Sequence, residues 1–197
     1  DEERAEALRD AERRVRAPVA PAPALAVGRA EAAVKALALD LAASGATVVD
    51  ALKSLTQLIE NAYDSEAADL AAALRKQGAV ERLCSLLGGE AQVHRRAMAI
   101  LANLASDAFE PRAIESARLV TRAGALPKLM THLGNDAAAQ GASRLYAAAC
   151  LQNMTALDGE VCDYLNQHGA AKVLVAIVQQ GGDAQLTHFA SGTLENM

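Results

Sequence analysis

Apolar residues recur three and four positions apart in short stretches from about residue 25 onward, and glycine or small polar clusters separate the stretches. This spacing predicts amphipathic α-helices joined by tight turns. In each of three units one glycine marks the turn between the first and second helices, because glycine adopts positive φ without steric penalty. The predicted first helices cover 66–77, 112–123 and 159–168, the second helices 80–87, 126–133 and 171–179, and the third helices 92–105, 143–156 and 184–197. A polar loop is expected at Gly134-Asn135-Asp136, and Asp158 and Asp183 are expected to cap the helices that follow them.

Two sequence markers repeat along the chain with a similar period. The turn marker is Gly78-Ala79-Val80, then Gly124-Ala125-Leu126, then Gly169-Ala170-Ala171, at intervals of 46 and 45 residues. The helix marker is Leu101-Ala102-Asn103-Leu104, then Leu151-Gln152-Asn153-Met154, then Leu194-Glu195-Asn196-Met197, with a degenerate earlier copy at Leu55-Thr56-Gln57-Leu58. Two independent markers with one period in the mid-forties predict an array of three-helix units that stack on each other.

Both markers together resemble the armadillo repeat, whose unit has a glycine turn between its first two helices and a third helix ending in Leu-x-Asn-Leu. The resemblance implies an all-α, right-handed α-solenoid of about three three-helix repeats plus a partial N-terminal one. The expected divisions are a degenerate partial repeat over 25–64 and repeats over 65–107, 108–157 and 158–197. A HEAT array has a similar period, but it has two helices per unit and no asparagine marker. Because no polar capping repeat follows residue 197, we expect the array to continue or a partner to cover this end.

The first 24 residues differ in character from the array. Residues 1–16 carry eleven charged side chains in a spacing that predicts an exposed helix, either solvated or docked on a neighbour. Pro18, Pro21 and Pro23 follow among alanine and valine, and proline cannot continue a helix. Residues 1–24 are therefore expected to be a charged helix followed by a stiff spacer.

Composition supports a helical protein and excludes some functions. Alanine, the best helix former, supplies 47 of the 197 residues, and there is no tryptophan. The net charge of −5 argues against a strongly basic nucleic-acid binder. Cys84, Cys150 and Cys162 form an odd set without CxxC spacing, which predicts buried thiols and a reducing compartment: cytoplasm or nucleus, or an organelle if a targeting segment has been removed. No apolar run reaches the roughly 18 residues that a bilayer crossing needs.

The helix-marker asparagines are the first candidate site residues. The resemblance implies that Asn103, Asn153 and Asn196, with Gln57 at the degenerate copy, line a concave groove and hold the backbone of a peptide. An amide side chain offers a donor and an acceptor, which match the C=O and N–H of a peptide unit. The alternative is that each asparagine only ties neighbouring helices together.

A second row of candidates lies seven residues before each asparagine. Arg96, Tyr146 and Phe189 occupy this position, and Arg95 lies beside the first of them. Arginine and aromatic residues are favoured interface anchors. Importin-α-like proteins carry tryptophan four residues before the asparagine, where this chain has Ala99, Ala149 and Gly192. A classical basic nuclear-localisation peptide is therefore not the expected ligand. The long basic groove of β-catenin-like proteins is matched only by Arg95, Arg96 and Arg144.

The sequence nominates no catalytic, metal-ligating or cofactor-binding residue. The four histidines lack paired-ligand spacing, and no phosphate-binding glycine motif is present. We therefore expect a non-catalytic protein–protein interaction scaffold that binds an extended or helical partner segment along the third-helix groove. The alternative is an architectural subunit held among neighbouring subunits by its ends, its convex face or its N-terminal helix.

Overall fold

The computed structural model describes residue 28, residues 46–134 and residues 141–197. These residues form ten α-helices and one 3-10 helix, without a β-strand among them. The first helices of the units are α4 (Ser65–Lys76), α7 (Ala113–Arg122) and α10 (Gly159–Gln167). The second helices are α5 (Ala79–Ser85), which runs into the 3-10 helix η1 (Leu86–Gly88), α8 (Leu126–Leu133) and α11 (Ala170–Gln180). The third helices are α3 (Ala46–Glu60), α6 (Ala91–Leu104), α9 (Gly141–Leu157) and α12 (Ala184–Asn196).

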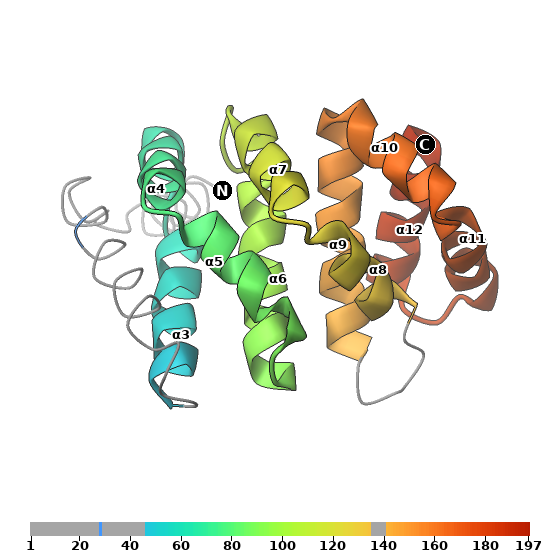
Figure 1. Cartoon of the computed structure of the whole chain (residues 1–197), viewed down its shortest axis with the longest axis horizontal. Helices are drawn as coiled ribbons and strands as arrows, with labels where there is room; N and C mark the ends of the chain where they lie inside the picture. Colours follow the sequence, from blue (N-terminus) through green and yellow to red (C-terminus); the bar gives the residue numbers. More distant parts are fainter. Residues whose placement is uncertain (1–27, 29–45, 135–140) are drawn as a thin grey trace, which may run out of the picture.

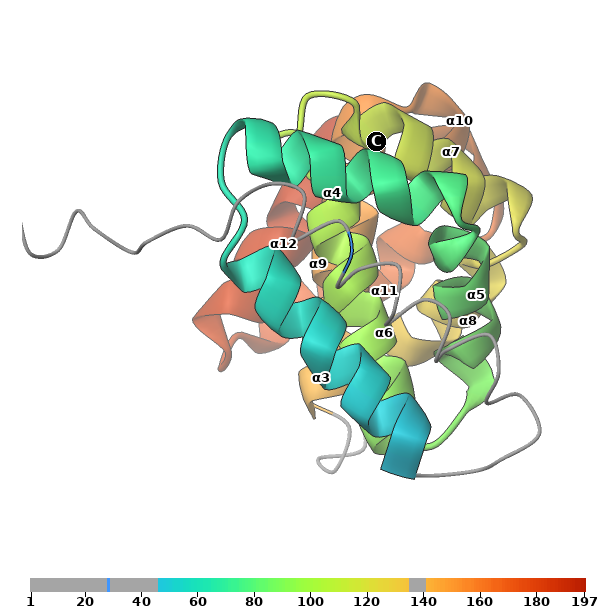
Figure 2. The same cartoon turned by 90° about the vertical axis from the view of Figure 1, so that its left-hand side faces the viewer.

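The helices build an elongated all-α solenoid. Figure 1 shows α3, α6, α9 and α12 side by side along the long axis, with α5, α8 and α11 crossing in front of them. Helices α4, α7 and α10 form a row along the top, and Figure 2 shows this row from the end of the array. The most extensive packing is between α9 and α12 and between α6 and α9, and α3 also packs against α6. The third helices therefore form one layer.

The turn from first to second helix requires a left-handed residue in each unit. Gly78, Gly124 and Gly169 have φ of 72°, 67° and 73°, which confirms the predicted turns. Other local predictions also hold: Asp158 and Asp183 cap α10 and α12 through their side chains. Each predicted helix of the three units lies within two residues of the observed bounds.

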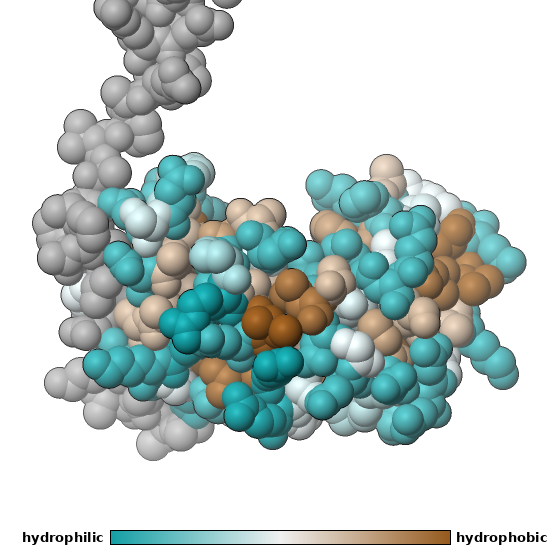
Figure 3. All heavy atoms as spheres, turned by 90° about the horizontal axis from the view of Figure 1, so that it is seen from above, coloured by the Kyte–Doolittle hydropathy of each residue, from teal (hydrophilic) through white to brown (hydrophobic). Residues whose placement is uncertain are grey.

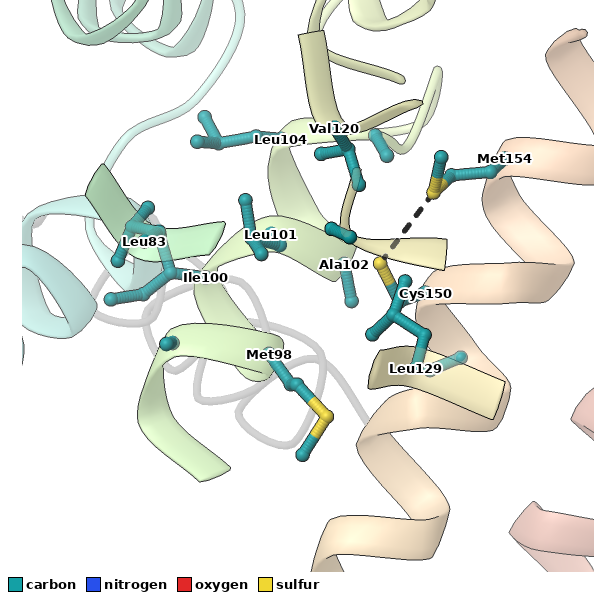
Figure 4. Close-up of a cluster of buried hydrophobic side chains, with 14 of the residues drawn as sticks. Leu83, Met98, Ile100, Leu101, Ala102, Leu104, Val120, Leu129, Cys150 and Met154 are labelled. Atoms are coloured by element: carbon teal, nitrogen blue, oxygen red, sulfur yellow. Dashed lines mark hydrogen bonds between the residues drawn. The ribbon is translucent and has the colours of Figure 1, made fainter. Parts of the chain in front are cut away.

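One hydrophobic core runs through the described array. Leu101 and Leu104 of α6, Val120 of α7 and Leu129 of α8 are completely buried. Figure 4 shows these side chains gathered with Met154 of α9, so each unit completes its core with side chains from the next. Burying such a side chain stabilises the fold by about 1.5–3 kcal/mol. Small buried alanines on the facing third helices, Ala97 and Ala102 of α6 and Ala147 and Ala148 of α9, let these helices approach closely.

Buried charges connect the first helices of successive units. Arg75 of α4 pairs with the fully buried Glu110, which precedes α7, and also donates to Ser116 Oγ at 2.9 Å. The other oxygen of Glu110 accepts from the backbone N–H of Arg112 at 2.8 Å. One carboxylate thus satisfies the start of α7 and anchors the preceding helix.

The next unit repeats this arrangement. Asp158 Oδ1 accepts from Glu160 N at 3.1 Å at the start of α10, while Oδ2 lies 3.5 Å from Arg118 Nε of α7. Two carboxylates therefore link α4 to α7 and α7 to α10 in the same way.

Several sequence expectations fall outside the described residues: the charged helix and spacer of residues 1–24, residues 25–45 of the partial repeat apart from Gly28, and the loop at Asn135-Asp136. The expected divisions after residues 64, 107 and 157 stay predictions; α4 begins at Ser65, α6 ends at Leu104 and α9 ends at Leu157.

Candidate partner-binding groove

A stripe of accessible side chains follows each third helix on the side that the first and second helices leave uncovered. On α6 the stripe contains Gln92, Arg95, Arg96, Ala99 and Asn103, whereas the remaining positions between His94 and Leu104 are buried. The spacing of three and four residues places these side chains on one face. Corresponding stripes run along α3, α9 and α12, so the four third helices present one continuous surface, called the groove surface below.

The face of the array seen from above has a mixed hydrophobic and hydrophilic surface. In Figure 3 hydrophobic residues on that face form small separate patches among hydrophilic ones, and the outline is indented on the third-helix side. The aromatic side chains that the groove surface offers are the half-buried Tyr146 and Phe189. Both pack partly against the core, so only part of each ring is accessible.

The structure places the candidate amide residues on corresponding last turns of the four third helices. Gln57, Asn103 and Asn196 are exposed, and Asn153 is half-buried. Asn153 Nδ2 donates to Ala102 O of the preceding third helix at 2.8 Å. Asn196 Nδ2 lies 3.1 Å from Thr155 Oγ1 and 3.4 Å from Gln152 O, also on the preceding third helix. These two asparagines tie neighbouring helices together, which is the alternative that the sequence left open. Their contact with a ligand stays a prediction.

Asn103 behaves differently from the other two asparagines. Its Nδ2 donates to Ala99 O of its own helix at 2.9 Å, and no neighbouring helix receives it. Ala102 O lies in the last turn of α6, where carbonyls lack intrahelical partners, and it accepts from Asn153. The side-chain amide of Asn103 binds only its own helix and remains accessible.

The second candidate row lies nearer the beginnings of the third helices. Arg96, Tyr146 and Phe189 are half-buried at corresponding positions of α6, α9 and α12. Arg95 donates through Nε to Ala91 O at 2.8 Å, which holds its side chain along α6. Arg96 forms no hydrogen bond or ion pair with another residue of the described chain. Its guanidinium is therefore available to an acceptor from outside.

Between the two rows the groove floor is made of small residues. Ala99 is half-buried and Ala149 is 8% exposed. A Cβ at Gly192 would lie 3.0 Å from Gln152 Cγ, so α12 and α9 are in close contact there. Residue 192 is one of the positions that carry tryptophan in importin-α-like proteins. In this chain the Gln152 side chain fills the space beside Gly192, so a large ring at residue 192 does not fit.

The cysteine thiols are expected to be poorly reactive. All three cysteines are free and buried, as predicted from their number and spacing. Burial raises the pKa of Cys84 to about 12 and also raises the pKa of Cys150 and Cys162, so the thiols stay protonated near neutral pH. Within the described ranges, groups of three or more His, Cys, Asp or Glu side chains that could hold a metal ion are absent.

Sequence reasoning missed the residues that join the units. The Arg75–Glu110 and Arg118–Asp158 pairs connect side chains 35 and 40 residues apart, and His94 lies against His132 at the junction that Arg75 and Glu110 also bridge. The only available signal was the burial-compatible position of His94 on the apolar face of α6. A lone histidine or glutamate in a helix gives no indication of a partner so distant in the sequence.

None of the described helices combines the length and the apolar character that a bilayer crossing requires. No protein-family model matches the sequence, and no curated protein matches it significantly.

Solved structures do match the fold. A designed armadillo repeat protein, YIII(Dq)4CqI, is 24% identical with a TM-score of 0.67, over 83% of this chain and 62% of that one. An engineered protein is 22% identical with a TM-score of 0.67, over 85% of this chain and 61% of that one. This chain therefore spans less than two thirds of either length. A third structure, a designed armadillo repeat protein in complex with the peptide (KR)4, is 19% identical with a TM-score of 0.55, over 89% of this chain and 82% of that one. The described helices thus form an armadillo-like repeat solenoid.

Proposed function

We propose that this protein is a non-catalytic protein–protein interaction scaffold that binds a segment of a partner along the groove surface. The observation that carries the proposal is the continuous stripe of accessible side chains on four adjacent third helices, which the other helices leave uncovered. An armadillo-like relative with a bound peptide supports the same use of the fold.

Asn103 and Arg96 form the centre of the proposed site. Both lie on α6, two helical turns or about 10 Å apart, and the small Ala99 lies between them. The Asn103 amide can exchange its exposed bond to Ala99 O for a carbonyl of the partner backbone, while its oxygen accepts a partner N–H. Arg96 can pair with a side chain of the same segment. Asn153 and Asn196 contribute their amide oxygens, since their N–H groups already bind neighbouring helices.

The groove favours a segment with acidic and apolar residues. Arg95 and Arg96 supply positive charge on α6, and Tyr146 and Phe189 supply partly accessible rings on the next two third helices. A carboxylate opposite Arg96 gains a charge-assisted hydrogen bond. A strongly basic segment such as (KR)4 meets repulsion there and finds no tryptophan to pack on.

Binding of an identified partner segment tests the proposal. Affinity capture identifies interacting proteins, and calorimetry on synthetic peptides from their sequences measures the dissociation constant. We expect Arg96→Ala and Asn103→Ala each to weaken binding about tenfold. Lys172→Ala, at an exposed position of α11 outside the groove, is the matched control. If both groove variants bind as tightly as the wild type, the groove is not the binding surface.

A fixed subunit of a larger assembly is the second candidate. Tyr63 and Val175 are 65% and 40% exposed, and they lie before α4 and on α11, outside the groove surface. Exposed apolar side chains of this kind suit packing against a neighbouring subunit. In that case Val175→Ser weakens assembly while Arg96→Ala and Asn103→Ala leave it unchanged.

A further inference from the structure

Two histidines meet at the junction between the unit of α4–α6 and the unit of α7–α9. His94 lies in the first turns of α6 and is 6% exposed, and His132 lies in the last turn of α8. Their ring centroids are 4.3 Å apart with an angle of 38° between the planes. The proposed groove function makes no use of this pair.

Hydrogen bonds to backbone carbonyls fix which nitrogen of each ring carries a proton. His94 Nδ1 lies 3.0 Å from Gly89 O, and His132 Nε2 lies 2.8 Å from Leu87 O. A carbonyl oxygen can only accept, so each of these nitrogens carries the proton. His94 Nε2 lies 2.8 Å from Ser143 Oγ of α9, and it accepts from that hydroxyl. The pair thus connects the end of η1 and the starts of α6 and α9 with the end of α8.

The surroundings disfavour an added proton. Ser143 is 1% exposed, and its hydroxyl would have to turn away from a protonated His94. Charged side chains on or directly before the elements around the pair are Glu90 before α6, Arg95 and Arg96 of α6, Glu81 and Arg82 of α5, Lys128 of α8, Arg144 of α9, and Asp50, Lys53 and Glu60 of α3. Lys128 is directed to Cys84 O, Arg144 binds Leu133 O, and Asp50 pairs with Lys53. None of these carboxylates forms an ion pair with either histidine.

We propose that the His94–His132 pair is an acid-sensitive joint, and that protonation loosens the packing of α8 and the start of α9 against α6. A proton on His94 places a cation in a buried site beside a second imidazole and near Arg95, and separating the two units relieves this cost. When both rings are neutral, all four elements are held by the three hydrogen bonds above.

The direction in which the pKa of His94 is shifted agrees with this geometry. Burial lowers the pKa of His94 below its ordinary value of 6.5, and the nearby His132 and Arg95 lower it further, while the bond to Gly89 O opposes the shift. The opened or unfolded chain therefore binds more protons than the native one in weakly acidic solution. The stability of the junction is complete above pH 6.5 and is lost as the pH falls from there through the lowered pKa of His94.

The joint and the second candidate row both lie near the beginnings of α6 and α9. His94 precedes Arg96 by two residues on α6, and Ser143 precedes Tyr146 by three on α9. Movement of α9 relative to α6 changes the spacing of Arg96 and Tyr146. If the groove is the binding surface, acid release of the partner follows, although the joint itself does not depend on that function.

Nitrogen-detected NMR of the wild-type chain provides the first test. We expect His94 to hold its proton on Nδ1 at pH 7.5, and to titrate below pH 6.5. Protonation of His94 at or above pH 6.5, or a proton on Nε2 at pH 7.5, would overturn the proposal. This measurement needs no variant.

Urea unfolding at pH 7.5 and 5.5 provides the second test. We expect the urea concentration at the unfolding midpoint of the wild type to fall on acidification. The fall should be smaller in His132→Gln, because the glutamine amide keeps a donor for Leu87 O but cannot become charged. His94 in His132→Gln should also titrate at a higher pH than in the wild type. His168→Gln, at an exposed position on α10, is the control and should match the wild type. Equal losses in the wild type and His132→Gln contradict the joint.

Discussion

Asn153 of α9 donates its side-chain amide to the backbone carbonyl of Ala102 on α6 at 2.8 Å, whereas Asn103, its counterpart on α6, binds only its own helix. The two residues occupy the same position of successive units, but only Asn153 binds the preceding third helix. The asparagines of the repeated marker therefore have different roles: Asn153 connects units, and Asn103 remains accessible.

This difference predicts unequal stability effects for the same substitution. Asn153→Ala leaves the carbonyl of the buried Ala102 without its partner, so we expect the free energy of unfolding to fall by about 1 kcal/mol. Asn103→Ala removes an exposed bond within one helix and should change it by less than about 0.5 kcal/mol. Urea denaturation followed by circular dichroism measures both. An equal loss in the two variants would mean that the bond to Ala102 contributes nothing.

Removing the Glu110 carboxylate should be far more costly. Glu110→Ala leaves Arg75, whose side chain is 8% exposed, with Ser116 and the half-exposed Glu115 as its remaining partners. Breaking a buried ion pair in this way costs about 3–5 kcal/mol. Thermal unfolding checks the value. Asp158→Ala is the comparison, and it should cost less, about 1–2 kcal/mol, because Arg118 is 59% exposed and mainly the helix cap is lost. The order of the two losses tests whether burial of the arginine sets the cost.

Two glycine substitutions should have opposite effects. Gly169 has φ of 73°, so Gly169→Ala strains the backbone although its Cβ would meet no atom within 4 Å, and we expect a loss of about 1 kcal/mol. Gly159 begins α10 with ordinary φ and equally open space, so Gly159→Ala should stabilise by about 0.5–1 kcal/mol. Thermal midpoints of the two variants give the comparison. A loss at Gly159 as large as the loss at Gly169 would contradict the assigned role of positive φ.

The cysteines should be unreactive in the native protein. Burial raises the pKa of Cys84 to about 12, and Cys150 is completely buried. We expect an aromatic disulfide reagent at pH 8 to modify native thiols at least about a hundredfold more slowly than the same thiols in urea. Rapid modification of one thiol in the native state would identify a cysteine that the structure does not protect.

Local features followed from the sequence because neighbouring residues cause them. The turn glycines needed only the steric freedom of their own backbone, and the caps at Asp158 and Asp183 needed only N–H groups two or three residues ahead. The helices could be placed within two residues for the same reason. The asparagines of the candidate site were also visible, because their marker repeats with the period of the array.

The sequence by itself determined the all-α repeat class, the helix order and the glycine turns, since these depend on apolar spacing and backbone preferences over a few residues. Only the tertiary structure decided which polar side chains connect the units. The partners of Glu110, Asn153 and His94 lie 35 to 51 residues away, and each contact depends on where a neighbouring helix ends and how closely it packs. A period in the sequence indicates that units stack, but the contacts between neighbouring helices determine which side chains the stack leaves accessible for a partner.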